Sequence, residues 1–427
     1  MEEKIKRKQG FVSISPMLVF LAVYTSSSII AGDFYAASII VSFLIASIYS
    51  IFIVKEKSIE SRFAVLARGA SKEDIMTMVF IFILAGAFAS TAKQMGGIDA
   101  TVTMTLRFMP IKMMLCGLFI ASCFVSLSIG TSVGTIAALT PIACGIAERT
   151  GQNLPMLIAV IVGGAYFGDN LSIISDTTIM ATKTQGCKMK DKFRYNLKIA
   201  LPAAIITLIL YLIEGTEVAA DEINNEVNYL LIIPYLYIIV AALCGMNVML
   251  LLSSGTLLAG ILGLLLGKLS LTEWSTAMND GIMGMGELII VTLLAGGIIE
   301  VIRETGGFEY LKTTLTRRIK SKTGAEISIA GLVILTDFCT ANNTIAILTT
   351  GPLAKEISKH YKIDPKRTAS ILDTFSCFAQ SIIPYGAQLL IASGLAYINP
   401  LEVIPYLYYP FVLGTFAFLY IIFKHEK

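Results

Sequence analysis

The chain has 427 residues, of which 55% are hydrophobic and 15% charged, and its mean hydropathy is +0.75. This composition is too apolar for a water-soluble protein of this size, so we expect the lipid bilayer to be the solvent. The net charge is only +3 and the basic residues form no single stripe, which argues against a nucleic-acid partner. The seven cysteines lack paired spacing, so we expect neither disulfides, nor a bound metal cofactor, nor any other cofactor.

The first half of the chain contains five apolar stretches that are each long enough to cross the bilayer, at about 20 residues per crossing. They lie near residues 14–31, 35–54, 74–92, 155–181 and 194–214. Between the third and the fourth, the apolar run 111–149 is interrupted midway by Gly130–Thr135 (GTSVGT), which predicts a helical hairpin. The hairpin enters and leaves on one side, whether it is re-entrant or fully spanning. Each half therefore makes an odd net number of crossings.

The second half repeats this plan. Spans are predicted near residues 228–244, 247–267, 282–302, 367–392 and 402–423, with a hairpin at 326–358. The tripeptide Leu84–Gly86 recurs as Leu294–Gly296, an offset of 210 residues, and Ser172–Ile174 matches Ser381–Ile383 with one residue less. Because each half crosses an odd number of times, the repeats must face opposite ways. The predicted fold is therefore an all-α polytopic membrane protein with two inverted-topology repeats.

The distribution of basic residues predicts the orientation. The repeats are assigned to residues 1–214 and 228–427, with an acidic connector at 215–227. If the chain starts in the cytoplasm, all but five of its 33 Lys and Arg residues are cytoplasmic, as the positive-inside rule requires. The five external residues are Lys93, Arg107, Lys112, Arg149 and Lys268. We expect a multi-pass protein of the cytoplasmic membrane with both termini inside; the sequence leaves open whether it is a homodimer.

Carboxylates within the apolar spans are candidates for function, because a charged side chain near the bilayer centre costs about 2.5–3.5 kcal/mol on insertion scales. Two of them flank a polar segment inside the span 155–181, whose Gly, Asn and hydroxyl residues favour a break in the helix, and the span 367–392 is its broken counterpart. Carboxylate, amide and hydroxyl oxygens together suit an alkali cation. The predicted ion- and proton-binding residues are Asp169, Asn170, Ser172, Ser175, Asp176, Thr177, Asp337, Asn342, Asn343 and Asp373.

The turns of the two hairpins supply further oxygen atoms at membrane depth. Thr131, Ser132, Thr135 and Thr344 are the predicted ligands at these turns, and a plain turn is the alternative. A second tier of candidates consists of Glu287, Glu300, Gln380 and Ser381. We expect no Lys or Arg deep in any span. That absence favours a bare cation, a zwitterion or an amine as the transported species.

Two motifs carry a resemblance to a known family. The segments Gly130–Thr135 and Gly164–Thr178 (GAYFGDNLSIISDTT) resemble those of the NhaC-type Na+/H+ antiporter family, and the regions around Asp337 and Asp373 are similar to its second half. Val133 and Ile173 depart from the pattern, since the family more often has an aromatic residue and a proline there. The resemblance implies exchange of Na+ and protons for some members, and transport of small organic acids or amino acids for others.

Three functions are compared on these grounds. The leading hypothesis is a Na+/H+ antiporter that works by alternating access, with Na+ and protons competing for buried aspartates. The alternative is a Na+- or H+-coupled transporter of a small organic solute, such as an organic acid, an amino acid or an amine. An intramembrane aspartyl protease fits poorly, because Tyr166 stands where its Gly-x-Gly-Asp motif needs glycine and the repeat has no use in a protease. The sequence therefore predicts a transporter and not an enzyme.

Overall fold

The computed structural model describes residues 2–31, 38–54, 58–108, 110–173, 175–215, 228–316 and 319–423, and these residues form helices and short connections without strands. The predicted connector 215–227 lies almost entirely outside the described residues. The helices of the first half are α1 (Glu2–Ala31), α2 (Ile39–Ile53), α3 (Ile59–Ala70), α4 (Glu73–Gln94), α5 (Gly97–Phe108), α6 (Met114–Ile129), α7 (Ser132–Thr150), α8 (Leu154–Leu171), α9 (Asp176–Gln185) and α10 (Met189–Glu214).

The second half repeats this series of helices about 210 residues later. Its helices are α11 (Ile233–Leu243), α12 (Val248–Leu265), α13 (Leu271–Gly284), α14 (Gly286–Glu304), α15 (Gly307–Thr316), α16 (Lys322–Thr340), α17 (Asn343–His360), α18 (Pro365–Ile382), α19 (Ala387–Ala396), α20 (Pro400–Val403) and α21 (Tyr408–Phe423). The pairs α6–α7 and α16–α17 are the predicted hairpins, and α8–α9 and α18–α19 are the broken helices. The last span is bent by 56° between its two helices.

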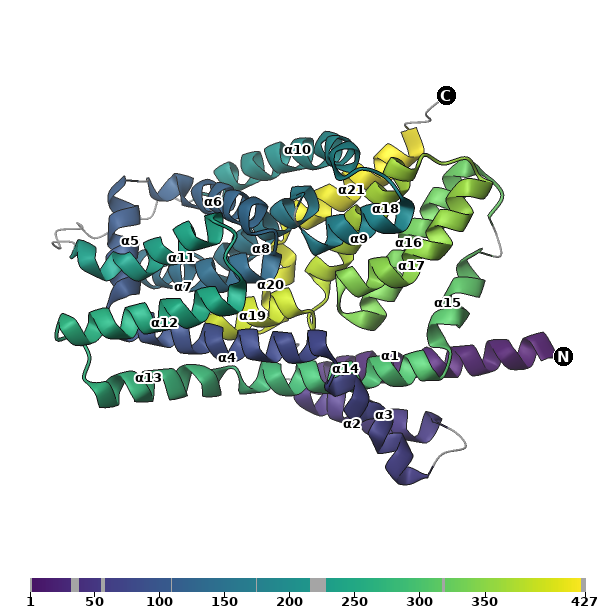
Figure 1. The fold of residues 1–427 in the computed structure, drawn as a ribbon, viewed down its shortest axis with the longest axis horizontal. Helices are drawn as coiled ribbons and strands as arrows, with labels where there is room; N and C mark the ends of the chain where they lie inside the picture. Colours follow the sequence, from purple (N-terminus) through teal and green to yellow (C-terminus); the bar gives the residue numbers. More distant parts are fainter. Residues whose placement is uncertain are drawn as a thin grey trace.

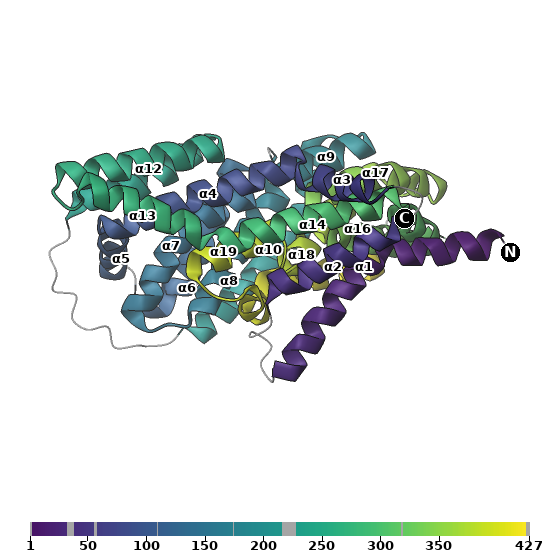
Figure 2. The same cartoon turned by 90° about the horizontal axis from the view of Figure 1, so that it is seen from below.

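The two repeats are inverted along the long axis of the molecule. Figure 1 shows α5 and the α6–α7 hairpin towards one end, and their counterparts α15 and α16–α17 towards the other. Figure 2 shows α4 and α14 pointing to opposite ends as well. Eight helical segments in the described ranges are long and apolar enough to cross a membrane, and three shorter apolar helices accompany them. The predicted fold class, an all-helical membrane protein with two inverted repeats, is confirmed.

Each hairpin turns through one residue in the left-handed region. Gly130 ends α6 with φ 75°, and Ala341 ends α16 at the equivalent place with φ 48°. Glycine adopts this conformation without the steric cost that a Cβ atom brings, so the first turn is relaxed and the second is strained. Both turns lie beside the same cavity.

The two repeats cross each other at two symmetry-related glycine contacts. α3 packs on α14, and its counterpart α13 packs on α4. A Cβ atom on Gly69 would lie 2.2 Å from the carbonyl oxygen of Gly296, and one on Gly281 would lie 2.1 Å from that of Gly86. The helix backbones therefore touch directly at both crossings. The short helices α3, α5, α13 and α15 were not expected from the apolar runs, because all four are short and amphipathic.

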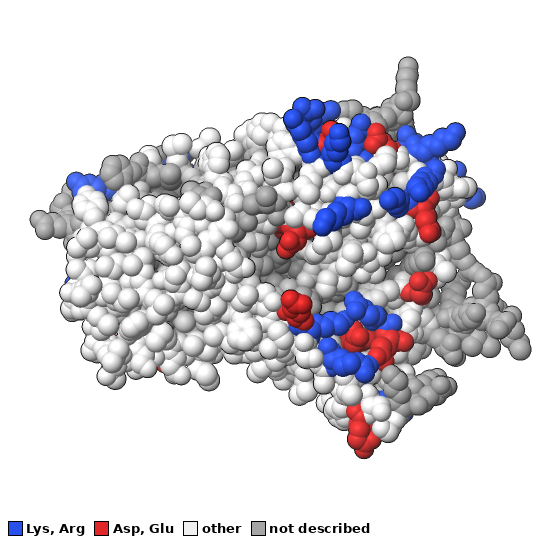
Figure 3. Space-filling model, in the orientation of Figure 1, with Lys and Arg blue, Asp and Glu red and all other residues white. Residues whose placement is uncertain are grey.

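Charged side chains gather at one end of the molecule. Figure 3 shows Lys, Arg, Asp and Glu over α3, α10, α16 and α17, whereas the opposite half of this face is almost free of charge. The charged end carries the residues that the positive-inside rule assigns to the cytoplasm. The uncharged half is the surface expected beside lipid. The long axis of Figure 1 is therefore the expected direction across the membrane.

Candidate functional site

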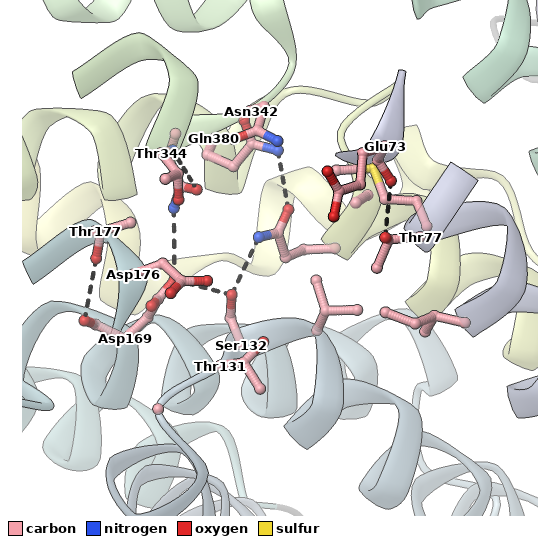
Figure 4. A pocket seen from close by; sticks show the side chains of 17 residues that line it. Glu73, Thr77, Thr131, Ser132, Asp169, Asp176, Thr177, Asn342, Thr344 and Gln380 are labelled. Atoms are coloured by element: carbon pink, nitrogen blue, oxygen red, sulfur yellow. Dashed lines mark hydrogen bonds between the residues drawn. The ribbon is translucent and has the colours of Figure 1, made fainter. Parts of the chain in front are cut away.

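A polar cavity of about 510 Å³ lies where the two hairpin turns meet the break between α8 and α9. Both repeats contribute to its wall. Figure 4 shows Asp169 and Thr177 on one side and Glu73 and Thr77, from the start of α4, on the other. The lining residues are Glu73, Thr77, Met78, Ile81, Gly130, Thr131, Ser132, Val133, Asp169, Asp176, Thr177, Asn342, Asn343, Thr344, Gln380, Ala387 and Gln388.

Asp169 is the buried carboxylate in the wall of this cavity, and three polar side chains contact it. It lies in the last turn of α8 and is 5% exposed. Ser132 donates a hydrogen bond of 3.0 Å to its Oδ2, and the Asn343 amide donates to the same oxygen at 3.4 Å. Ser175, in the break that follows α8, donates to Oδ1. One carboxylate therefore joins the first hairpin, the second hairpin and the broken helix.

At the break after α8, Ser175 and Thr177 lie together inside the protein, whereas Asp176 between them is exposed. Ser175 lies 2.9 Å from the hydroxyl of Thr177, and both are buried. Asp176 starts α9 and is exposed, although it lines the same cavity as Asp169. The expectation that Asp176 is a second buried carboxylate is therefore wrong, because the helix ends at Leu171 and restarts with Asp176 turned to the open side.

A second polar cluster lies directly behind Asp169. Asp373, in the middle of α18, is fully buried and accepts hydrogen bonds of 2.9 Å from the amides of both Asn170 and Asn196. Its Oδ2 also lies 2.6 Å from the Nζ of Lys192, which is fully buried as well. Asn170 thus connects the two clusters, since it follows Asp169 in the chain and contacts Asp373.

The buried position of Lys192 contradicts the expectation that no basic residue lies deep in a span. The sequence places Lys192 in a basic cytoplasmic segment between two spans, so nothing in its neighbours marks it as buried. In the fold, α10 begins at Met189 and packs its first turns against α8, α9 and α18. Its partner Asn196 lies one turn further along the helix. The polar spacing of Lys192 and Asn196, four residues apart on one helix face, is the signal that sequence reading missed.

Asp337 is buried in the second hairpin, outside the cavity wall. It is 0% exposed. Within the described chain, no side chain donates to either of its oxygens. Asp337 therefore lies at the turn of α16–α17 as expected, but it is not brought together with Asp169 and Asp373.

The remaining residues of the hairpin turns have mixed roles. Asn342 caps α17 by accepting from the backbone of Ile345 at 3.1 Å, and both Asn342 and Thr344 line the cavity. Thr131 lines it too. Thr135 does not, because its hydroxyl donates to the carbonyl of Thr131 at 3.1 Å. Of these predicted ligands, Thr135 is therefore the one whose side chain faces the backbone of its own hairpin and not the cavity.

Two glutamines extend the network across the repeats. The Gln380 amide donates to Gln388 at 2.9 Å, and the Gln388 amide donates to Ser132 at 3.1 Å, so a chain of hydrogen bonds leads from α18 through α19 to Asp169. Gln388 was not expected from the sequence. Two predicted serines have other partners, since Ser172 donates to the Leu127 carbonyl and Ser381 to the Phe378 carbonyl.

The second-tier glutamates lie away from this network. Glu287 is exposed and lines a separate cavity of about 480 Å³. Glu300 pairs with Lys72 across the α3–α14 crossing and lies 3.8 Å from Arg303. Neither glutamate lines the cavity at Asp169. In the described residues, no group of three His, Cys, Asp or Glu side chains is arranged to hold a metal ion.

Comparison with known proteins identifies relatives that match most of the chain. The "Malate-2H(+)/Na(+)-lactate antiporter" of Bacillus subtilis is 21% identical over 374 residues, which cover 80% of each chain. The "Na(+)/H(+) antiporter NhaC" of the same organism is 23% identical and covers 81% of this chain and 83% of its own. The "Arginine/ornithine antiporter ArcD" of Halobacterium salinarum is also 23% identical, over 67% of this chain and 66% of its own.

A solved structure and a family model complete the comparison. The crystal structure of the Alcanivorax borkumensis YdaH transporter matches 81% of this chain and 85% of its own, with 13% identity and a TM-score of 0.41. The model of the Na+/H+ antiporter family matches residues 8–216 and 218–425, which together are nearly the whole chain. The chain therefore belongs to the Na+/H+ antiporter family.

Proposed function

We propose that this protein is a secondary transporter that exchanges cytoplasmic Na+ for external protons, and that both ions bind at Asp169. The observation that carries the proposal is the convergence of Ser132, Asn343 and Ser175 on one buried carboxylate. Three separate elements meet there, so occupancy of this carboxylate is sensitive to their relative positions. The Asp169 carboxylate can hold either a proton or a Na+ ion, but not both at once.

The hydroxyl groups beside Asp169 suit this competition. A hydroxyl carries one donor and two acceptor lone pairs, so Ser132, Ser175 and Thr177 can either donate to an empty carboxylate or turn their lone pairs towards a cation. With the Asp169 carboxylate they supply oxygen ligands, which hard cations prefer. When a proton binds to Asp169, its charge disappears and a cation loses its strongest ligand. Na+ and protons are therefore expected to displace each other.

The position of the cavity suggests the direction of access. Glu73 and Thr77 stand at the start of α4, which follows the basic stretch that the positive-inside rule places in the cytoplasm. We infer that the cavity opens towards the cytoplasm, that both termini are cytoplasmic and that the protein resides in the cytoplasmic membrane. The inverted repeats supply the second, outward-facing conformation that alternating access requires.

Transport in everted vesicles tests the proposal. Asp169→Asn keeps the size of the side chain but can neither carry a proton nor neutralise Na+, so we expect it to abolish Na+-dependent proton release. Glu287→Gln makes the same chemical change in a separate cavity and should leave exchange intact. Full exchange by folded Asp169→Asn protein would show that this carboxylate is not the ion carrier.

The size and charge of the cavity favour a second candidate function, the coupled transport of a small organic amine or amino acid. Its volume of about 510 Å³ is in the range of sites for small molecules, of about 300–1,000 Å³. Asp169, Asp176 and Glu73 line it, whereas no Lys or Arg is among its lining residues in the described chain. An amine is therefore the more fitting solute, and an organic acid would have to rely on the amide groups.

Purified protein in liposomes distinguishes the two candidates. With an imposed pH gradient, Na+ alone should drive proton flux if the protein is a Na+/H+ antiporter. If it is a solute carrier, flux should require an added amine or amino acid. An imposed gradient of arginine, ornithine, malate or lactate, each tested with and without Na+, identifies the solute in that case.

A further inference from the structure

Lys192 occupies a position in which a small cation could bind. Its Nζ lies 2.6 Å from Asp373 Oδ2, 2.6 Å from the carbonyl oxygen of Asn170 and 2.7 Å from the hydroxyl of Thr178. These three oxygens come from α18, α8 and α9. Lys192 is 0% exposed, so the ammonium group is held within the protein without bulk water.

We propose that the Lys192 ammonium group is a tethered cation that fills a second cation site, so that the protein binds a single mobile Na+ at Asp169. This inference rests on the proposed function. A carboxylate, a main-chain carbonyl and a hydroxyl are the oxygen types that hard cations select. The Asn170 carbonyl belongs to the last turn of α8, whose carbonyls lose their helical partners where the helix breaks at Ser172.

The repeat shows that the fold itself does not require this lysine. With the offset of 210 residues, the counterpart of Lys192 is Glu402, which caps α20 together with Asn399. The counterpart of Asp373 is Gly163, which has no side chain to pair. The second repeat thus forms the same helices without a counterpart of the Lys192–Asp373 pair. The pair joins Lys192 of the first repeat to Asp373 of the second and has no symmetry-related copy, so the repeated helix pattern does not require it.

The Lys192 ammonium group lies next to Asp169, and this position determines how many Na+ ions the protein can bind. Asn170 follows Asp169 directly, and its carbonyl is the one that Lys192 contacts. A Na+ in the second site would therefore lie close to a Na+ at Asp169. Because Lys192 takes this place, one ion binds and releases with each cycle. Removal of the ammonium group should open the second site, since the carboxylate of Asp373 would remain buried without a cation.

Equilibrium binding of 22Na+ to purified protein tests this inference. We expect wild-type protein to bind one Na+ and Lys192→Ala to bind two. Lys192→Arg keeps a tethered cation and should bind one. Lys192→Ala combined with Asp373→Asn removes the ligand as well as the ammonium group, so it should also return to one.

If Lys192→Ala folds poorly, a measurement of its thermal stability in two salts still tests the inference. Its thermal transition in detergent should rise more steeply with NaCl than that of wild type, with choline chloride as the matched salt, because a ligand stabilises the state that binds it. A Lys192→Ala protein that binds one Na+, or whose thermal transition rises with NaCl no more steeply than that of wild type, overturns the tethered-cation inference. Wild-type protein that binds no Na+ overturns the proposed function instead.

Discussion

Ser132 and Asn343 are equivalent residues of the two repeats, and both donate to the same oxygen of Asp169. Each is the first residue of the second helix of its hairpin, α7 or α17. The Ser132 hydroxyl lies 3.0 Å from Asp169 Oδ2 and the Asn343 amide lies 3.4 Å from it. Equivalent residues of the two repeats thus contact the same oxygen atom, although the carboxylate itself belongs to the first repeat alone. Movement of either hairpin must change how this oxygen is satisfied.

Ser132→Ala should weaken Na+ binding in the transport assay. A hydrogen bond to a charged group contributes about 1.5–3 kcal/mol, and each 1.4 kcal/mol is about tenfold in affinity, so we expect the Na+ concentration for half-maximal exchange to rise about ten- to a hundredfold. Asn343→Ala should have a smaller effect in the same direction, because its contact is longer. Ser381→Ala is the control, since this hydroxyl bonds its own helix. An unchanged Na+ dependence in Ser132→Ala would contradict the assignment.

The strained turn at Ala341 predicts a stabilising substitution. A non-glycine residue in the left-handed region costs about 1–2 kcal/mol, so Ala341→Gly should raise the free energy of unfolding by about 1 kcal/mol. Gly130→Ala, at the equivalent turn, should lower it by a similar amount. Thermal unfolding of both variants in detergent measures the pair. A drop in stability for Ala341→Gly would show that the turn is not under strain.

The glycine crossings predict two matched losses of stability. Gly69→Ala and Gly281→Ala each place a Cβ atom against a main-chain carbonyl, which cannot move aside as a flexible side chain does. We expect each to cost about 1–3 kcal/mol, the usual range for overpacking. Gly331→Ala in α16 is the control, because no atom lies within 4 Å of its Cβ position, and it should be neutral or stabilising. Equal stability of all three variants would mean that the crossings are looser than the structure shows.

A buried ion pair at the start of α16 and α18 predicts an asymmetric result. Arg367 contacts Glu326 through two short contacts of 2.6 and 2.7 Å, and both side chains are 2% exposed. Arg367→Met leaves a buried carboxylate without its partner, which typically costs about 3–5 kcal/mol. Adding Glu326→Leu should restore most of the stability, as measured by thermal unfolding. A double variant as unstable as the single one would show that other contacts of Arg367 dominate.

The inferred direction of access predicts whether a cysteine in each cavity is labelled in everted or in right-side-out vesicles. In protein whose native cysteines are replaced by serine, Thr77→Cys lines the site cavity, whereas Gln152→Cys lines a cavity of about 380 Å³ on the side predicted to be external. A membrane-impermeant maleimide should label Thr77→Cys in everted vesicles and Gln152→Cys in right-side-out vesicles. The reverse pattern would invert the proposed topology.

The sequence predicted the architecture well because hydrophobic length and a repeat in constant register are global signals. The spans, both hairpins and the break after Leu171 follow from apolar runs interrupted by Gly, Asn and hydroxyl residues. The helices α3, α5, α13 and α15 were missed, since short amphipathic or polar helices leave no such run. Their packing against the opposite repeat is a property of the folded molecule.

The site was predicted in part, for a reason that particular residues illustrate. Asp169 and Asn170 stood out because polar residues are rare in an apolar span. Lys192 and Gln388 did not, because Lys192 lies among basic neighbours and Gln388 is one amide in a short helix. Only tertiary packing shows that the start of α10 closes over the break in α8 and that α19 reaches Ser132. The exposure of Asp176 likewise depends on how α9 restarts.

The contact between Lys192 and Asp373 also determines the net charge of the three residues Asp169, Lys192 and Asp373. The pair is neutral by itself, so the charge of this trio is that of Asp169: minus one when it is empty, and zero with either a proton or a Na+. An unbalanced charge at the bilayer centre costs about 2.5–3.5 kcal/mol on insertion scales, which corresponds to roughly a hundredfold penalty for a rearrangement that exposes it to lipid. A carrier built in this way reorients readily when loaded and slowly when empty, so the tethered lysine would suppress leak and make the two ion movements obligatory to each other.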